Sequence, residues 1–529
     1  MNTHIVSQLA NGPENAVSFL LDRHAQGDRA ERTAVLHQSA RVSYGQLART
    51  VNQVGNYLLD LGLQPEQRVM LHLPDGPEWV YFFMAAIKIG AVAVPVSTFC
   101  DAEQLAFYLN DSRARLLVTR RQYAAKSPSY ETAPLLEHIV YVDDAPWKAY
   151  STARSAFAVT PDDSAFWVYT SGSTGRQKAV VHRHGGMLAC AQSYCRDVLD
   201  IRDSDRCYSA SKSFFAYGLG NSITFPFSVG AASILCSSAS DAETVVRTIR
   251  QFKPTLFFGV PAVYQQLLKA PHVERELFAG VRMCLSAGEY LSETLFESWR
   301  ARTGHVLYDG IGTTEAMHIF CSNRPSSYRA GTSGVPVQGY DLKIVDSNGT
   351  ELGPSNAGRL LVRGKTLAAG YWNRCEQNRS AFLGEWLATG DIYQKTEDGF
   401  FKYIGRQDDV FKSSGLWVSP GEIEQALLTC PHVTEAAVVA VKHEGGSILA
   451  KAFVVLAEAA RRESPHDIRQ EIYTHLDGRL SKYKIPSDIQ FVISLPRTAT
   501  GKVSRAELRR REAVESMTDA GGTAPVANL

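Results

Sequence analysis

The sequence lacks the features that mark secreted, membrane-spanning and polyanion-binding proteins. Its nine cysteines form no CxxC pair, so neither a disulfide framework nor a zinc cluster is indicated, and we expect a cytoplasmic protein. No basic segment followed by an apolar core opens the chain, and the most apolar segment, 80–96, is interrupted by Lys88 and Gly90. We therefore expect neither a signal peptide nor a membrane-spanning helix.

The chain also lacks a surplus of charge, since 55 basic side chains face 54 acidic ones in 529 residues. Proteins that bind nucleic acid or anionic membranes usually carry a basic surplus, so neither partner is indicated. Hydrophobic residues make up 45% of the chain, and its 40 glycines and 22 prolines are typical of a globular protein. At about 150 residues per domain, the length predicts three or four compact units.

The first half of the chain alternates between helical and strand patterns. Apolar residues between 47 and 61 follow the 4-3-4-3 spacing of one helix face, Ser43 and Gln46 fit a capping box, and Gly62 fits a C-terminal cap. The expected strands are 69–73, 91–94, 116–119, 139–142 and 255–260, and further helices are expected at 78–89, 245–252 and 262–268. This rhythm predicts an α/β fold of doubly wound, mostly parallel sheets.

After about Arg324 the pattern changes to short strands and turns, which predicts a small β-rich subdomain. The polar segment 405–409 separates two apolar strands and is the boundary that we expect between domains. Later elements are expected at 342–345, 359–363, 420 onward, 436–441, 450–456 and 468–480. We therefore predict a large N-terminal domain over 1–407, a mobile α+β domain over 408–512 and a disordered tail over 513–529.

The segment from Phe166 to His182 carries the strongest chemical signal. An apolar strand leads into six small or hydroxyl residues, 170–175, then to Lys178 and a second apolar strand. Glycine N–H groups, hydroxyls and a lysine together form a phosphate cradle, although composition alone also fits a plain Ser/Gly loop. The segment is not a Walker loop, because Gln177 stands where that pattern has glycine and no helix is indicated after it.

This loop resembles the phosphate loop of the acyl-adenylate-forming superfamily, Thr-Ser-Gly-Ser-Thr-Gly-x-Pro-Lys-Gly, found in CoA ligases, luciferases and peptide-synthetase adenylation domains. The chain departs from it at Gln177 and Ala179, neither of which removes a phosphate contact. Further motifs of the superfamily follow in order between about Ser43 and Arg510. The resemblance implies that ATP phosphates are bound by Thr170, Ser171, Gly172, Ser173, Thr174, Gly175 and Lys178.

Two further motifs resemble the segments around the adenine and the α-phosphate. Residues 286–289, Ser-Ala-Gly-Glu, and 309–315, Asp-Gly-Ile-Gly-Thr-Thr-Glu, occupy the expected places, with Ile311 where many members stack a tyrosine. By resemblance Thr314 contacts the α-phosphate, and Glu315 holds Mg²⁺, which prefers hard oxygen ligands. The remaining residues implied in nucleotide binding here are Ala287, Gly288, Glu289, Asp309, Gly310 and Ile311.

The C-terminal motifs resemble the ribose site, the hinge and the mobile catalytic lysine of the superfamily. The resemblance implies that Asp391 and Arg406 bind the ribose and that Asp408 is the hinge. It also implies that Lys502, in Pro-Arg-Thr-Ala-Thr-Gly-Lys, reaches the reacting carboxylate and the α-phosphate during adenylation. Lys412 and Gly415 would approach the active site in the later, thioester-forming state.

The aromatic segment 214–221, Phe-Phe-Ala-Tyr-Gly-Leu-Gly-Asn, resembles the acyl pocket of benzoate-CoA ligases and related aryl-CoA ligases, although core packing would explain the same residues. Peptide-synthetase domains place an aspartate after a phenylalanine here, whereas Ala216 follows Phe215 in this chain. By resemblance the pocket for one aromatic ring is lined by Phe215, Ala216, Tyr217, Ala287, Gly312, His318 and Ile319.

The resemblance thus implies an AMP-forming aryl-CoA ligase, a monomer or homodimer, that uses ATP, Mg²⁺ and coenzyme A. Its acid substrate would be benzoate or a small ring-substituted benzoate such as 2-aminobenzoate, a choice that one polar contact can decide. An enzyme that loads an aryl group onto a carrier protein would share the nucleotide motifs. A non-catalytic acyl-adenylate sensor is a further alternative, against which the presence of Glu315, Asp391, Arg406 and Lys502 argues.

Overall fold

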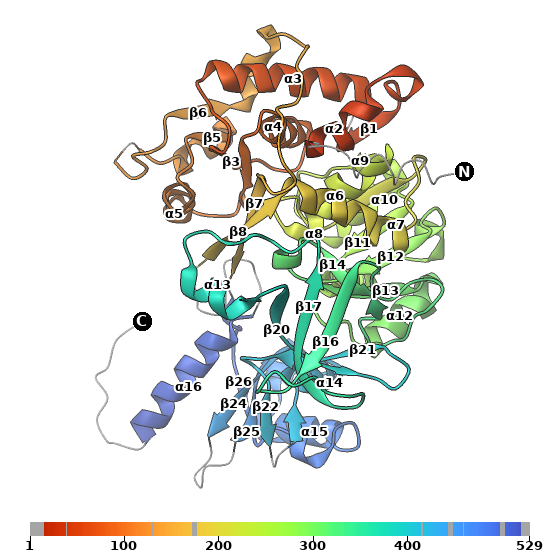
Figure 1. Ribbon diagram of the computed structural model, residues 1–529. Coiled ribbons are helices and arrows are strands. Elements are labelled where there is room, and N and C mark those ends of the chain that lie inside the picture. The colour runs from red at the N-terminus through yellow and green to blue at the C-terminus, as the bar shows by residue number, and fades with distance from the viewer. Residues whose placement is uncertain are drawn as a thin grey trace. The chain divides into compact units, whose positions relative to one another are not determined.

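The computed structural model describes residues 15–38, 40–129, 131–171, 177–413, 416–442, 448–458, 460–497 and 503–519 (Figure 1). Contacts divide the chain into two compact units. Unit 1 comprises Met1–Lys343, Leu361–Thr389 and Asp398–Phe401, and unit 2 comprises Ile344–Leu360, Gly390–Glu397 and Lys402–Leu529. The last transition, at Lys402, lies close to the expected boundary at 407, but two earlier segments also belong to unit 2.

One sheet of unit 1 carries the two strands that flank the expected phosphate loop. Its strands are β3 (Arg68–Leu71), β4 (Val92–Pro95), β5 (Leu116–Thr119), β6 (His138–Tyr141), β7 (Ser164–Ser171), β8 (Gln177–Arg183) and β18 (Gly370–Tyr371), in the order β18-β8-β7-β4-β3-β5-β6. The run from β7 to β6 is parallel, whereas β7 pairs with β8 and β8 with β18 antiparallel. The phosphate loop therefore lies between two neighbouring antiparallel strands, the arrangement of a hairpin.

A second sheet of unit 1 carries the expected adenine and aryl segments. Its strands are β1 (Thr33–His37), β2 (Ala40–Ser43), β9 (Arg206–Ser209), β10 (Ala232–Ile234), β11 (Leu256–Gly259), β12 (Met283–Ser286), β13 (Leu307–Gly312), β14 (Ile319–Ser322) and β15 (Val335–Pro336). They follow the order β15-β14-β13-β12-β11-β9-β10-β1-β2, with parallel pairs from β13 to β1 and antiparallel pairs at both edges.

Helices cover these sheets and build the cores. Helix α5 (Ala102–Ser112) packs Leu105 and Leu109 against β5 and β4 of the first sheet. Helices α10 (Ala242–Phe252), α11 (Pro261–Lys269) and α12 (Glu293–Thr303) bury Ile249, Tyr264 and Trp299 beside β11. Each large apolar side chain buried in this way contributes about 1.5–3 kcal/mol. The doubly wound α/β prediction is confirmed.

Helix α3 (Tyr44–Asp60) forms as the sequence predicts. Ser43 Oγ accepts a hydrogen bond from the Gln46 N–H at 3.3 Å, and Gln46 Oε1 accepts one from the Ser43 N–H at 2.9 Å, which completes the capping box. Gly62 adopts a φ of +82° and its N–H donates to the Leu59 carbonyl at 2.9 Å, as expected of a terminating glycine. Helix α4 (Pro77–Lys88) likewise matches its expected range to within one residue.

The β-rich region that follows the second sheet is also present. Its strands are β16 (Tyr340–Val345), β17 (Ala357–Gly364), β19 (Phe382–Leu383), β20 (Trp386–Lys395) and β21 (Phe401–Arg406), in the order β16-β17-β20-β19 with β21 paired to β20. The division between the two units falls within β16, β17 and β20. The predicted change from α/β to short antiparallel strands after residue 324 is therefore confirmed.

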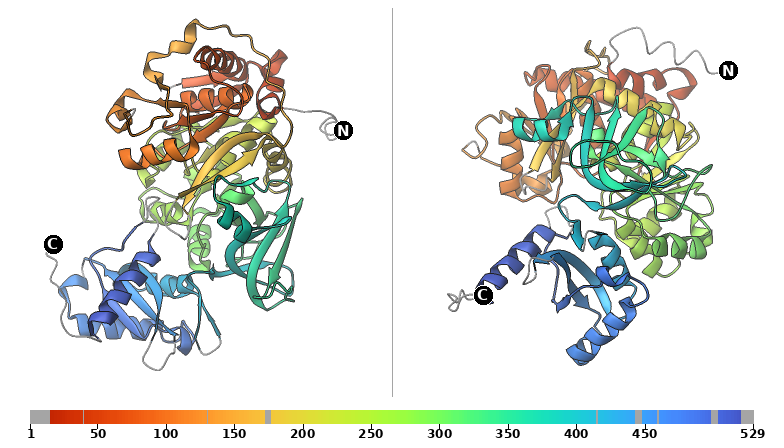
Figure 2. Two further views of the ribbon diagram at one scale, coloured as in Figure 1. Left: turned by 60° about the vertical axis from the view of Figure 1, so that its left-hand side comes forward. Right: turned by 60° about the horizontal axis from the view of Figure 1, so that its bottom comes forward.

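Unit 2 also contains a sheet with helices on its two faces (Figure 2). Its strands are β24 (Val433–Lys442), β25 (Ile448–Leu456) and β26 (Asp488–Phe491), and the helices are α14 (Pro420–Leu428), α15 (Pro465–Leu476) and α16 (Arg505–Asp519). Val438 packs with α14 and α15, whereas its neighbours Ala437 and Val439 pack with Leu508 of α16. Because alternate residues of a strand point to opposite faces, α16 covers the face opposite α14 and α15.

Two helix ends differ from the sequence predictions. Helix α15 ends at Leu476 rather than Leu480, because Gly478 takes a φ of +81° that stops the helix. Helix α16 runs to Asp519 and so includes residues 513–519 of the segment predicted to be a disordered tail; residues 520–529 lie outside the described part of the chain. Glu507 pairs with Arg510 and Arg511 one turn later, and such pairs stabilise an exposed helix.

The remaining helices of unit 1 include α2 (Ala16–Leu20), α6 (His184–Gln192) and α7 (Tyr194–Asp197). In the part of the chain that the structure describes, no helix combines the length and the apolar character needed to cross a membrane.

Candidate active site

Strands β7 and β8 fix the base of the expected phosphate loop. Their register pairs Thr170 with Lys178 and Ser171 with Gln177, so the threonine and the lysine stand opposite each other where the loop leaves the sheet. The loop residues Gly172, Ser173, Thr174 and Gly175 lie outside the described residues, as does the side chain of Ser171. The hairpin connection agrees with the prediction that no Walker-type helix follows the loop.

Lys178 and Glu315 meet at the same side chain, Tyr371 of β18. The Lys178 ammonium lies 4.4 Å from the centre of the Tyr371 ring, and the Tyr371 hydroxyl donates a hydrogen bond of 2.7 Å to Glu315 Oε1. The second oxygen of Glu315 accepts a hydrogen bond from the Thr313 hydroxyl. The expected phosphate-binding lysine thus contacts the ring of Tyr371, and the expected metal-binding carboxylate contacts its hydroxyl.

The turn that carries Thr314 and Glu315 is tight and strained. After the 3₁₀ turn Thr314–Ala316, Met317 takes φ 68° and ψ −40°, and the His318 N–H donates to the Ala316 carbonyl at 2.8 Å. This is a γ-turn at a buried non-glycine residue, a conformation that costs about 1–3 kcal/mol and tends to occur at functional sites. The Ala368 N–H donates to the Glu315 carbonyl at 2.8 Å and ties the turn to the segment before β18.

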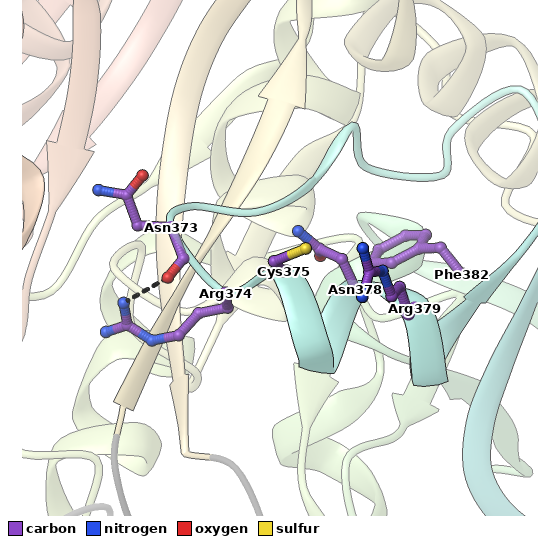
Figure 3. A pocket seen from close by; sticks show the side chains of 6 residues that line it. All are labelled: Asn373, Arg374, Cys375, Asn378, Arg379 and Phe382. Carbon is purple, nitrogen blue, oxygen red and sulfur yellow. Dashed lines mark hydrogen bonds between the residues drawn. The ribbon is translucent and has the colours of Figure 1, made fainter.

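Helix α13 (Cys375–Ala381) holds Tyr371 by its main chain. Asn378 Oδ1 accepts from the Tyr371 N–H at 2.7 Å, and Asn378 Nδ2 donates to the Tyr371 carbonyl at 2.8 Å. Figure 3 shows Asn378 on α13, where it also lines a surface pocket with Asn373, Arg374, Cys375, Arg379 and Phe382. Sequence reasoning missed Tyr371, because β18 has two residues and so offers no periodic signal.

The expected adenine segment lies at the carboxyl ends of two neighbouring parallel strands. Ser286 of β12 pairs with Asp309 of β13, and Ala287 next to it is buried, whereas Gly288 and Glu289 are exposed. Such an edge is where α/β sheets usually bind ligands. Burial raises the pKa of Asp309 well above its ordinary value, and its Oδ1 has no hydrogen-bond partner among the described residues. Gly310 and Ile311 follow in β13 and pair with β14.

The expected aryl pocket is built around a break in helical geometry. A π-helical turn, Gly220–Thr224, separates α8 (Ala216–Leu219) from α9 (Phe225–Val229), and such turns are frequent at functional sites. The rings of Tyr217 and His318 stack at 5.3 Å, and His318 Nε2 lies 3.2 Å from the Tyr217 carbonyl. Burial lowers the pKa of His318 to about 3, so this imidazole is neutral at physiological pH.

Glycine is required where this pocket meets the γ-turn. A Cβ at Gly312 would lie 2.4 Å from the His318 carbonyl oxygen, and one at Gly220 would lie 2.3 Å from His318 Cδ2. The structure therefore brings Tyr217, Gly312 and His318 together. Ala287, which follows β12, and Ile319, which begins β14, are both buried. Phe215 packs against Phe214 with ring centres 4.6 Å apart, beside Ala216 at the start of α8.

The expected ribose-binding residues lie in unit 2 and form an ion pair. Arg406 Nη1 of β21 lies 2.9 Å from Asp391 Oδ1 of β20. Gly390, next to Asp391, has a φ of +74°, a backbone conformation that favours glycine. Tyr403 of β21 is half-buried, and desolvation, followed by the nearby negative charge of Asp391, raises its pKa.

The segment expected to act as hinge is held by arginines of α16. Asp409 Oδ1 lies 2.8 Å from Arg509 Nη1 and its Oδ2 lies 3.6 Å from Arg505 Nη1, while Asp408 itself is exposed and its carbonyl accepts from Arg509 at 3.2 Å. Lys412, in β22 (Phe411–Ser413), lies 5.0 Å from the ring of Trp417 in β23 (Leu416–Val418). Gly415 and Lys502 lie outside the described residues.

Each unit, taken by itself, carries side chains of the kinds that the resemblance implies. Unit 1 carries a lysine, a carboxylate and hydroxyls for phosphates and a cation, and a stacked Tyr217–His318 pair for an aromatic ring. Unit 2 carries a carboxylate–guanidinium pair for sugar hydroxyls.

Comparison with known proteins agrees with this chemistry. The family model of AMP-binding enzymes matches residues 21–372, and the model of the AMP-binding enzyme C-terminal domain matches residues 422–502. The chain is 38% identical over 505 residues to a benzoate–CoA ligase of Thauera aromatica, covering 94% of this chain and 95% of that one.

Two solved structures share the fold over nearly the whole chain. The anthranilate CoA ligase AuaEII, in complex with anthranoyl-AMP, is 37% identical with a TM-score of 0.90 and covers 96% of this chain and 99% of its own. A benzoate CoA ligase from Burkholderia xenovorans LB400 is 34% identical with a TM-score of 0.84 and covers 94% of this chain and 100% of its own.

Proposed function

The chain belongs to the family of AMP-binding enzymes, and we propose that it is an ATP-dependent aryl-CoA ligase. It activates a benzoate-type acid as an aryl adenylate and transfers the aryl group to coenzyme A. The observation that carries the proposal is the convergence of Lys178 and Glu315 on Tyr371 at the mouth of the β7–β8 hairpin. That arrangement supports the proposal, because a cation suited to phosphates and a carboxylate suited to a metal ion contact the same side chain.

The donor set at Glu315 fits Mg²⁺ bound together with a nucleotide. Mg²⁺ usually takes one or two carboxylates and completes its shell with substrate phosphates and water. Among the described residues no group of three His, Cys, Asp or Glu side chains forms a metal cage, so Glu315 is the protein ligand in this proposal. When bound, Mg²⁺ neutralises charge on the phosphates and on the leaving pyrophosphate.

In the first half-reaction a carboxylate oxygen of the acid attacks the α-phosphorus of ATP. The new bond joins the acyl oxygen to phosphorus, and the bond to the bridging oxygen of pyrophosphate breaks. Because two anions approach each other, the site must supply positive charge as the transition state forms. We assign this role to Lys178 at the hairpin and to Lys502, with the Thr314 hydroxyl on the α-phosphate.

The nucleoside and the acid are held by separate groups. We assign the ribose hydroxyls to Asp391, whose carboxylate accepts hydrogen bonds, and the adenine to the edge formed by residues 287–289 and 309–311. The aromatic ring of the acid lies against Tyr217 and His318, where the neutral imidazole adds a flat surface without a charge. This pocket favours benzoate or a small derivative such as 2-aminobenzoate.

In the second half-reaction the thiol sulfur of coenzyme A attacks the acyl carbon, the bond from that carbon to the AMP oxygen breaks, and the thiol proton is released to solvent. We propose that the C-terminal domain turns about Asp408 between the two steps, which withdraws Lys502 and brings Lys412 and Gly415 to the thiol path. Seven of the nine free cysteines are buried thiols, which fits a reducing compartment, and we place the reaction in the cytoplasm.

A panel of benzoic acids tests the proposed reaction. Benzoate, 2-aminobenzoate and the hydroxybenzoates are each incubated with ATP and Mg²⁺, with and without coenzyme A, and AMP and thioester are measured. We expect catalytic AMP release only when coenzyme A and an aromatic acid are both present. Transfer to an acyl carrier protein with no transfer to coenzyme A, or no acid-dependent release at all, would contradict the proposal.

The Lys502→Ala variant separates the two half-reactions. We expect the rate of aryl adenylate formation to fall about 1000-fold, because the variant lacks a positive charge that stabilises the transition state of that step. Thioester formation from supplied aryl adenylate should remain within about threefold of the wild type. Lys482→Ala, at an exposed lysine outside the site, serves as the matched control. An equal loss of both half-reactions would refute the two-state assignment.

A further inference from the structure

Tyr371 contacts Glu315, Lys178 and Asn378, three residues from separate parts of unit 1. Its hydroxyl donates to Glu315 at 2.7 Å, its ring lies 4.4 Å from the Lys178 ammonium, and its main chain is held on both sides by Asn378. The side chain is buried, with 8% of its surface exposed. The orientation of this tyrosine is therefore fixed by its surroundings before any ligand binds.

The contacts to Glu315 preserve its negative charge. Tyr371 and Thr313 are neutral donors, so each orients one carboxylate oxygen without cancelling the charge as an arginine would. A hydrogen bond to an ionised group is about twice as strong as one between neutral groups, and it fixes the plane of the carboxylate. The carboxylate thus keeps both its charge and a defined direction for a divalent cation.

The contact with Lys178 is made by the face of the ring rather than by the hydroxyl. A lysine has a flexible four-carbon stem, and holding its ammonium over an aromatic face limits the positions that it samples. Lys178 is half-buried at the base of the hairpin, opposite Thr170. The ring therefore keeps the ammonium near the phosphates' expected place without pairing it to a carboxylate that would compete with them.

We propose that Tyr371 is a positioning residue that sets Glu315 for the metal ion through its hydroxyl and Lys178 for the phosphates through its ring. The proposal rests on the proposed function for the identity of the ligands, Mg²⁺ and ATP. The role of the hydroxyl predicts a defect in Mg²⁺ binding, and the role of the ring predicts a defect in ATP binding. The two defects can be separated because different substitutions remove the hydroxyl alone and the whole ring. A tyrosine that only fills space would produce neither defect selectively.

Binding measurements without the aromatic acid test both parts. Isothermal titration measures ATP binding with excess EDTA, and again at rising Mg²⁺, for the wild type, Tyr371→Phe and Tyr371→Leu. Tyr371→Phe should leave the metal-free ATP affinity unchanged and lower the apparent affinity for Mg²⁺ in the presence of ATP about 10- to 100-fold, because it removes the hydrogen bond that orients Glu315 and keeps the ring. Tyr371→Leu should also weaken metal-free ATP binding, by about two- to fivefold, because the ring is gone.

Tyr340→Phe is the matched control. It removes another buried tyrosine hydroxyl, whose hydrogen bond of 2.7 Å goes to Thr366 rather than to Glu315, and we expect no change in either affinity. An unchanged Mg²⁺ dependence in Tyr371→Phe would overturn the proposal, as would an equal shift in Tyr340→Phe. Melting temperatures establish that each variant folds, and if Tyr371→Leu does not fold, the Phe variant decides the metal part alone.

These outcomes are distinguishable from failure of the proposed function. If the wild type binds Mg²⁺ and ATP but makes no aryl-CoA, the reaction assignment fails while the role of Tyr371 is still measured. If the wild type makes aryl-CoA and Tyr371→Phe keeps the wild-type Mg²⁺ dependence, the positioning role fails while the reaction assignment stands.

Discussion

The two carboxylates expected to hold the nucleotide are supported in opposite ways in the two units. Glu315 of unit 1 accepts hydrogen bonds from the hydroxyls of Tyr371 and Thr313, which carry no charge. Asp391 of unit 2 is paired with the guanidinium of Arg406 at 2.9 Å. One acid is oriented with its charge intact, and the other is oriented by a cation that offsets its charge.

This difference matches the ligands that we assign to each acid. A divalent cation is attracted by an uncompensated carboxylate, whereas sugar hydroxyls need acceptor oxygens of fixed position and little net charge. The Arg406 side chain is 48% exposed, so solvent screens the pair and it adds little to folding stability. We therefore interpret the Asp391–Arg406 pair as a device for orientation rather than for stability.

The largest effect is expected at Glu315. Glu315→Gln keeps the shape and most hydrogen bonds but removes the charge, and should lower kcat/KM for aryl adenylate formation about 1000-fold, or ~4 kcal/mol. Acid-dependent exchange between pyrophosphate and ATP measures this step. Glu297→Gln, an exposed acid on α12, is the control. Activity near that of the wild type would refute the proposed difference between Glu315 and Asp391, because the charge of Glu315 would then not matter.

A smaller effect is expected at Asp391, where charge is already offset. Asp391→Asn should raise the KM for ATP about 10- to 100-fold and leave kcat nearly unchanged, because ribose contacts stabilise the ground and transition states alike. The wild type should discriminate against 2′,3′-dideoxy-ATP, and the variant should not. If the variant retained that discrimination, the ribose assignment would be refuted.

The sequence predicts most of the fold because its local signals agree with the final structure. The capping box at Ser43 and Gln46 predicts where α3 begins, and Gly62 predicts where it ends, and the structure has both ends at these positions. Helix α16 is the instructive exception. The composition of its last residues predicts disorder, yet the helix includes residues up to Asp519. Leu508, near its start, is buried against β24 and β25, and this tertiary contact leaves no local sequence pattern.

Residues of the candidate site can be proposed from the sequence where they lie in a contiguous motif, and not where they meet only in the folded chain. Lys178 and Glu315 stand in motifs, whereas Tyr371 reaches them from a two-residue strand almost two hundred positions beyond the lysine. The strain at Met317 was equally hidden, since a methionine carries no sequence signal for a positive φ. Long-range partners of this kind become visible only when the sheet order is known.

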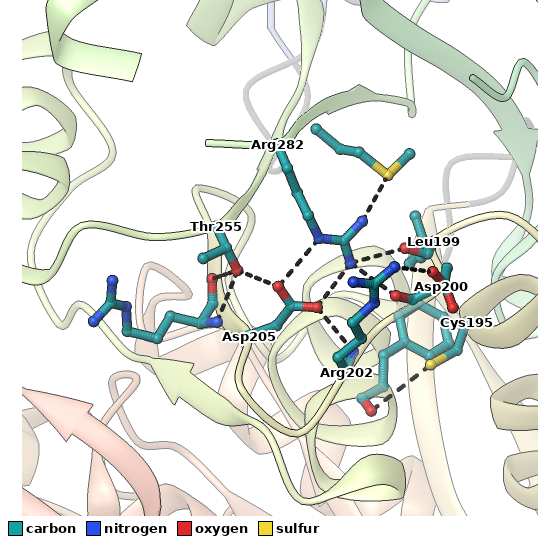
Figure 4. A network of polar contacts seen from close by, with 10 residues as sticks. Cys195, Leu199, Asp200, Arg202, Asp205, Thr255 and Arg282 are labelled. Atoms are coloured by element: carbon teal, nitrogen blue, oxygen red, sulfur yellow. Dashed lines mark hydrogen bonds and ion pairs between the residues drawn. The ribbon is translucent and has the colours of Figure 1, made fainter. Parts of the chain in front are cut away.

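A third carboxylate sharpens the comparison, because it pairs with an arginine away from the proposed site. Asp205 accepts hydrogen bonds from Arg282 at 2.7 and 3.1 Å and from the Thr255 hydroxyl at 2.7 Å, and its side chain is 6% exposed (Figure 4). Burial alone would raise the pKa of Asp205, but these hydrogen bonds outweigh it and the pKa lies below its ordinary value. The native state therefore binds fewer protons at this group than the unfolded chain does.

The smallest effect on activity is therefore expected at Asp205. The stability that this acid contributes is present at pH values above about 4 and is lost as the pH falls through its lowered native pKa. Asp205→Asn should lower the free energy of unfolding by about 1–3 kcal/mol at pH 7, less than for a fully buried pair because Arg282 is 33% exposed, and should flatten this part of the acid dependence. Urea unfolding across pH measures both, with the exposed Asp200→Asn as control. We expect Asp205→Asn to be less stable with unchanged KM and kcat, and Asp391→Asn to be stable with an altered KM for ATP. This result would show that the Asp205–Arg282 pair supports the fold and the Asp391–Arg406 pair binds the ligand. The reverse result would show that the Asp391–Arg406 pair supports the fold instead.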